Sequence, residues 1–230
     1  MRRGLFGKLR SKRDFVAHGA PRGFLAVFEP WIQGCVASSR AQLGADWQAA
    51  FLTAPIWRFW LGPQICGATA LGAVMPSMDG VGRYFPLSLA LFADEGEALP
   101  SPEADAQDEW FAAVEDFLLS TLERETPFEA ILEAFEALPA PAFDGAQARL
   151  LPSGVAAARV GERGFAAACR AAREAEERAR TTAATSFWWT DGGERFERLA
   201  LVANGMPAPS VFAAMISGRP DAPAQVDERG

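Results

Sequence analysis

The chain has 230 residues, of which half are apolar and 22% are charged, and its net charge of −7 gives a pI near 4.9. This acidic balance argues against nucleic acid as a partner of the whole molecule, while seven tryptophans and 17 phenylalanines argue against intrinsic disorder. The three cysteines are widely spaced without a Cys-x-x-Cys pair, so neither a disulfide framework nor a zinc site is indicated. We therefore expect a reduced, cytoplasmic protein.

The positive charge is concentrated at the N-terminus. Residues 1–22 contain seven lysines and arginines against the single acidic residue Asp14, a local charge of +6 that leaves −13 for the remainder. A peripheral membrane adaptor that uses this basic segment is one alternative function. The segment lacks the sustained amphipathic pattern of an interfacial helix, and no run approaches the roughly 18 apolar residues of a membrane span, so both patterns disfavour membrane contact.

The first 55 residues predict one strand followed by helices. Gly4–Leu9 alternates like a short strand, and from Pro21 the apolar residues follow helical spacing. Pro30 should kink this helix or begin a new one, and Gly44 should end it. A short helix is expected to follow, with Asp46 as its N-cap.

Three strands are predicted next, because the apolar pattern changes to short β-rich runs. They are Ile56–Leu61, Leu71–Met75 and Leu87–Phe92. The connections between them are too short for crossover helices, which favours antiparallel neighbours.

The second half predicts helices first and strands afterwards. An acidic loop over residues 93–108 precedes a helix with the stripe Trp110 to Leu122, and Thr126-Pro127-Phe128-Glu129 is typical of a capped helix start. After the weakly patterned Pro139–Gly161, we expect a half-exposed helix over Glu162–Thr181, strands at Ser186–Gly193 and Arg198–Ala203, and a last helix from Ser210.

Together these elements predict an α/β fold, in which a mixed or antiparallel β-sheet is flanked by helices on both faces. No linker divides the chain convincingly, so residues 1–217 are assigned to a single domain. The proline-rich, charged residues 218–230 are assigned to a mobile C-terminal tail.

The loop Met75–Leu87 is the strongest candidate for a binding element, since irregular loops between strands commonly carry binding groups. Two prolines and a glycine-rich turn shape it, and it contains the only tyrosine of the chain, Tyr84. We expect Tyr84 and Phe85 to anchor the loop, while Asp79 and Arg83 face a protein partner. A loop-internal ion pair between Asp79 and Arg83 is the alternative.

Trp188 and Trp189 form a second candidate. Alternation along a strand sends the two rings to opposite faces of the sheet. If helices cover both faces, both tryptophans belong to the core, and otherwise one of them is an exposed interface anchor.

Catalytic patterns are absent from the sequence. His18 is the single histidine, no Gly-x-Ser-x-Gly elbow accompanies it, and no phosphate-binding loop or metal-ligand spacing is present. We therefore expect no catalytic residue, no cofactor and no metal. A small enzyme that uses Asp79 and Arg83, with Asp14 or His18, remains the alternative.

Several ordered blocks resemble one known family. They are Gly7-Lys8-Leu9 with Asp14-Phe15, Thr53-Ala54-Pro55-Ile56-Trp57-Arg58-Phe59, Met75-Pro76-Ser77-Met78-Asp79 with Val81-Gly82-Arg83-Tyr84-Phe85-Pro86-Leu87, and Ser186-Phe187-Trp188-Trp189. As a set they resemble the type VI secretion system-associated family TagF. Arg10 and Arg13 stand where the family pattern has proline and glycine.

The resemblance implies a non-enzymatic, cytoplasmic accessory protein with an α/β fold. It implies post-translational repression of type VI secretion, exerted by binding the forkhead-associated scaffold protein of the secretion apparatus. The oligomeric state is left open. The residues that we predict to contact the partner are Asp79, Arg83, Trp188 and Asp14.

Overall fold

The computed structural model describes residues 1–94, 99–123, 126–143, 148–151, 155–193 and 195–218. Most of the predicted tail therefore lies outside the described residues. Within them, no helix has the length and apolarity that crossing a membrane requires.

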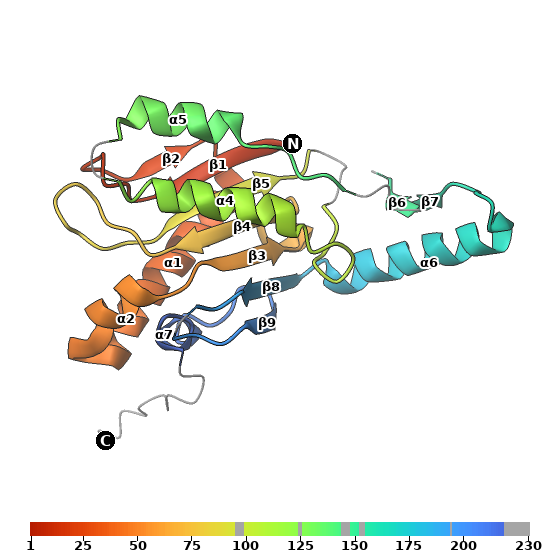
Figure 1. Ribbon diagram of the computed structural model, residues 1–230. Helices are drawn as coiled ribbons and strands as arrows, with labels where there is room; N and C mark the ends of the chain where they lie inside the picture. Colours follow the sequence, from red (N-terminus) through yellow and green to blue (C-terminus); the bar gives the residue numbers. More distant parts are fainter. Residues whose placement is uncertain (95–98, 124–125, 144–147, 152–154, 194, 219–230) are drawn as a thin grey trace, which may run out of the picture.

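A seven-stranded sheet forms the centre of the molecule (Figure 1), in the order β2-β1-β5-β4-β3-β8-β9. Every pairing in it is antiparallel, so the fold class is confirmed and, of the two predicted sheet types, the antiparallel one is correct. The strands are β1 (Arg2–Gly7), β2 (Val16–His18), β3 (Trp57–Leu61), β4 (Ala70–Met75), β5 (Leu87–Phe92), β8 (Thr185–Thr190) and β9 (Leu199–Asn204).

Helices cover both faces of this sheet. The helices are α1 (Arg22–Leu43), α2 (Trp47–Thr53), α3 (Pro63–Cys66), α4 (Asp108–Ser120), α5 (Phe128–Ala137), α6 (Gly164–Thr182) and α7 (Val211–Ser217), with a 3-10 turn at Gly44–Asp46. One core packs the sheet against α1, α2 and α7, and the other packs it against α4 and α5. Strands β3, β4 and β5 are buried on both faces, which explains their continuous apolar sequences.

A long excursion separates α4 and α5 from the C-terminal elements β8, β9 and α7 in the sequence. Helix α6 projects away from the sheet, and the small hairpin of β6 (Ala148–Leu150) and β7 (Ala156–Ala158) lies beside it (Figure 1). The chain then returns as β8, which pairs with β3 and completes the sheet together with β9. The core between the sheet and α1, α2 and α7 therefore needs residues from the C-terminal part of the chain.

Some local predictions need correction. Pro30 does not begin a new helix, because α1 runs continuously through it, while Gly44 ends the helix with a positive φ of 52° as expected. The segment Val16–His18, for which no strand is predicted, is the edge strand β2. The side chain of Asp46 makes no capping hydrogen bond at the start of α2.

Arg58 is a buried cation that crosslinks three parts of the fold. Its guanidinium group, only 5% exposed, reaches Glu115 of α4 at 2.6 Å, Asp191 after β8 at 2.6 Å and Asp108 at 3.3 Å. It also lies 5.1 Å from the ring of Phe111. Strand β3 is thereby fixed to α4 and to the β8–β9 connection.

Candidate functional site

Sheet topology brings two loops together that are about 70 residues apart in the sequence. Gly7 at the end of β1 pairs with Leu87 at the start of β5, so the segments that leave and enter these strands are neighbours. We call these segments, residues 8–15 and 76–86, the paired loops. Two hydrogen bonds to backbone carbonyls join them: the Ser77 hydroxyl donates to the Lys8 carbonyl at 2.8 Å, and the Gly80 amide donates to the Lys12 carbonyl at 2.8 Å.

Glycine is required where the paired loops meet. Gly7 has a φ of 135°, and a Cβ atom on it would lie 2.1 Å from the carbonyl oxygen of Pro86. Any other residue would force the two segments apart. Gly82, with a φ of 85°, donates its amide to the Asp79 carbonyl at 3.0 Å and closes the predicted turn.

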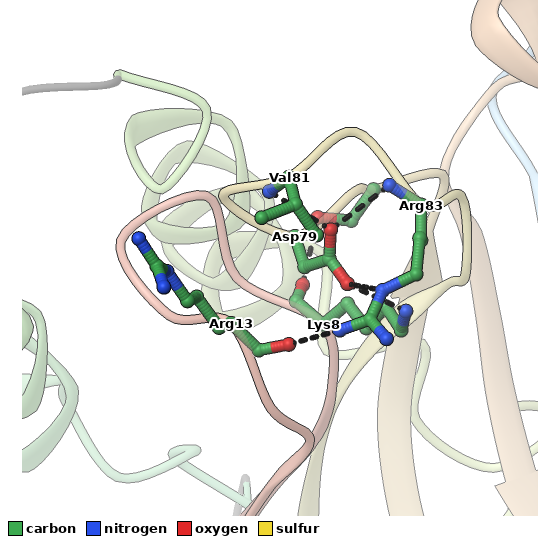
Figure 2. Close-up of polar contacts among 6 residues, drawn as sticks. Lys8, Arg13, Asp79, Val81 and Arg83 are labelled. Carbon is green, nitrogen blue, oxygen red and sulfur yellow. Dashed lines mark hydrogen bonds and ion pairs between the residues drawn. The ribbon is translucent and has the colours of Figure 1, made fainter.

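The carboxylate of Asp79 organises the paired loops (Figure 2) and is fully buried. Its Oδ2 accepts hydrogen bonds from Lys8 Nζ at 2.7 Å and Arg83 Nε at 2.6 Å. Its Oδ1 accepts from the backbone amides of Arg83 at 2.9 Å and Val81 at 3.1 Å. The Arg83 guanidinium also donates to the Arg13 carbonyl, so one carboxylate and one guanidinium tie the two loops to each other.

The pKa of Asp79 is strongly perturbed. Burial alone would raise it, but the hydrogen bonds from Lys8, from the Arg83 amide and guanidinium, and from the Val81 amide outweigh burial and hold the pKa well below its ordinary value. The group is therefore ionised at any physiological pH.

This depressed pKa predicts how stability depends on acid. An unfolded aspartate has a pKa of about 3.9, so the contribution of Asp79 is fully present above that pH and is lost as the pH falls from there toward the folded pKa. We expect the free energy of unfolding to fall more steeply between pH 5 and pH 2 in the wild type than in Asp79→Asn. Urea denaturation at several pH values measures both slopes, and equal slopes would contradict the assignment.

Of the loop residues predicted to contact a partner, Asp79 is buried, whereas Arg83 and Asp14 are exposed. The Asp79–Arg83 pair exists, as the alternative interpretation had it, and Asp79 does not face outward, since it is only 2% exposed. The guanidinium side chain of Arg83 is 60% exposed, and Asp14 also lies at the surface. Tyr84 is half-buried, with its hydroxyl 2.8 Å from Gln48 Nε2, and Phe85 is buried, so both anchor the loop as predicted.

Trp188 belongs to the core rather than to a surface. Its ring is fully buried and packs 4.7 Å from Trp31 and 5.2 Å from Phe59, measured between ring centroids. Trp189 points to the opposite face, where it lies edge-on to Phe111 at 5.1 Å. Since α1 covers Trp188, a docked partner would not reach it, and we remove it from the predicted contact residues.

His18 lies beside α5. Its ring is edge-on to Phe135 at 5.7 Å, and its Nε2 is 3.5 Å from a carboxylate oxygen of Glu136. The contacts found among the described residues thus join His18 to α5, whereas Asp79 and Arg83 are joined to the loop after β1.

Two buried cations, Lys8 and Arg58, were not among the predicted site residues. Lys8 is 6% exposed and is the partner of Asp79, although nothing in the sequence linked positions 71 residues apart. Arg58 stood inside an apolar strand, which was the one signal that it had to be paired in the core.

Comparison with known proteins gives the family. Residues 4–138, more than half of the chain, match the model of the TagF N-terminal domain, described as type VI secretion system-associated. The chain belongs to the TagF family. It is similar along 94% of its length to the crystal structure of PA0076 from Pseudomonas aeruginosa PAO1, with 33% sequence identity, a TM-score of 0.77 and 94% of that chain covered. No curated protein matches the sequence significantly.

The TagF family model does not include the C-terminal strands and helix of the chain. The family model ends at residue 138, at the end of α5. In this TagF protein, β8, β9 and α7 follow that point and pack into the same sheet and core, with β8 paired to β3. The family domain therefore reaches its complete sheet only with the C-terminal residues, and the likeness to PA0076 extends across them.

Proposed function

We propose that this TagF protein is a non-enzymatic, cytoplasmic regulator that represses type VI secretion after translation by binding the forkhead-associated scaffold protein of the apparatus. The observation that carries the proposal is the match of residues 4–138 to a type VI secretion-associated family, together with a similar fold along 94% of PA0076. A protein that regulates by binding needs a surface of fixed shape. The paired loops provide one, because the contacts of Asp79 hold them together.

The state of Asp79 supports binding over catalysis. A general acid or base has to exchange a proton with a substrate and works best with a pKa near the working pH. The carboxylate of Asp79 is buried, accepts four hydrogen bonds and has a strongly lowered pKa. Asp79 and Arg83 therefore serve better as a structural brace than as the centre of a small active site.

Secretion by the native host tests the proposal. Deleting the gene should raise the amount of a type VI effector in the culture medium, while transcripts of the apparatus components stay constant, because repression acts on assembled protein. Overproduction should have the opposite effect. Unchanged secretion in both strains would contradict the proposal, and a change that follows altered transcripts would contradict its post-translational part.

A further inference from the structure

The paired loops form a cationic surface on an acidic protein. Residues 8–15 and 76–86 contain five cationic side chains and only two acidic ones, a net charge of +3 in a chain whose total is −7. Because Lys8 and Asp79 neutralise each other in the interior, the outward charge comes from the remaining cations. Of these, Arg13 and Arg83 are exposed and Arg10 and Lys12 are half-buried, while Asp14 is the exposed acidic residue of the same loops.

The cations with assigned contacts are held in place. The Arg83 side chain is 60% exposed, yet its Nε is bound to Asp79 and its terminal nitrogen to the Arg13 carbonyl. Lys12 Nζ lies 4.0 Å above the ring of Phe128 at the start of α5. In Figure 2 the side chain of Arg13 points away from Asp79. Because the side chains of Arg83 and Lys12 are already held by these contacts, they lose little conformational entropy when a ligand binds.

Apolar side chains are exposed on the same loops. Phe15 is 49% exposed and Val81, at the tip of the turn, is 56% exposed. Phe15 does not swing freely, because its ring contacts Phe85 at 4.8 Å and Phe6 at 6.2 Å between centroids. The surface thus combines fixed cations with a fixed aromatic group, a combination typical of protein-binding hot spots.

We infer that the paired loops bind an acidic segment of a partner protein, with carboxylates on Arg13 and Arg83 and an apolar side chain against Phe15. Arginine binds carboxylates with two parallel hydrogen bonds, and free donor positions remain on an exposed guanidinium. That the occupant is a protein rests on the proposed function. Charge complementarity favours an acidic occupant, since the paired loops carry +3.

A labelled peptide tests this inference directly. The probe is a fluorescein-labelled nonapeptide of eight glutamates around a central leucine, titrated with the full chain and followed by fluorescence anisotropy. We expect saturable binding that weakens with added salt. Arg13→Glu should weaken peptide binding by at least about tenfold, because it replaces attraction by repulsion. The side chains that bind Asp79, Lys8 and Arg83, stay unchanged in this variant. Phe15→Ser should also weaken peptide binding.

Matched controls separate this effect from general charge. Arg170→Glu changes an exposed arginine of the projecting helix α6 by the same amount and should leave peptide binding within about twofold of wild type. No binding by the wild type, or equal losses in Arg13→Glu and Arg170→Glu, would overturn the inference. Displacement of the peptide by inorganic phosphate at equal concentration, or Arg13-dependent binding to phosphatidylglycerol vesicles, would also overturn it, in favour of a small anion or a membrane. Because no scaffold protein is present, these outcomes are independent of the proposed partner.

Discussion

Replacing Asp79 with alanine should lower the free energy of unfolding by about 3–5 kcal/mol. The carboxylate is fully buried and pairs with Lys8, whose own side chain is 8% exposed, so its removal leaves a buried ammonium group without a counter-charge. Two backbone amides of the turn, those of Val81 and Arg83, also lose their acceptor. Urea denaturation followed by tryptophan fluorescence measures the loss.

A second substitution tests how much of this loss comes from the unpaired charge of Lys8. In the double variant Lys8→Met, Asp79→Ala, the buried charge is gone, and part of the lost stability should return. Asp14→Ala provides the control, because it removes an exposed carboxylate of the same loops and should change stability by less than about 0.5 kcal/mol. A loss for Asp79→Ala no larger than that of the control would show that Asp79 does not brace the loops.

Trp188→Ala should cost about 3–5 kcal/mol as well, but through packing rather than charge. The ring fills the space between Trp31 and Phe59 under α1 and is fully buried. Trp189→Ala is the matched comparison, since Trp189 is the neighbouring residue on the other face and is half-buried. We expect a clearly smaller loss there, measured by the same denaturation experiment.

A phenylalanine at position 188 should be tolerated far better than alanine. The indole Nε1 of Trp188 is buried without a hydrogen-bond partner among the described residues, and such an orphaned donor costs about 1–3 kcal/mol. Trp188→Phe removes this cost while it keeps an aromatic ring, so the net change should be below about 1.5 kcal/mol. If Trp188→Ala instead kept full stability and lost partner binding, the residue would be a surface anchor and its core assignment would be wrong.

The strands of the central sheet were predictable because burial on both faces leaves a strong sequence signal. Ile56–Leu61, Leu71–Met75 and Leu87–Phe92 were found close to their observed bounds, and their short connections indicated the antiparallel order. Edge strand β2 was missed, since three residues with only Val16 buried carry no periodicity. Of the two outcomes predicted at Pro30, a new helix is wrong, because α1 continues through the proline.

The candidate site was predictable only in its local part. The turn and the Asp79–Arg83 pair lie within five residues, so composition and spacing pointed to them. The prediction that Asp79 faces outward is wrong. Its burial depends on its pairing with Lys8, and the register of β1 against β5 brings these two residues together. Long-range register of this kind cannot be derived from one sequence, and it is what turns an exposed loop pair into a fixed surface.

Copurification from the native host tests the central claim most directly. The tagged full chain should recover the forkhead-associated scaffold protein, Arg170→Glu should recover it equally, and Arg13→Glu should recover much less while it remains folded. Equal recovery by the wild type and both variants would support the scaffold protein as partner and would show that it binds outside the paired loops. Failure of the wild-type chain to recover the scaffold would contradict the proposed function itself.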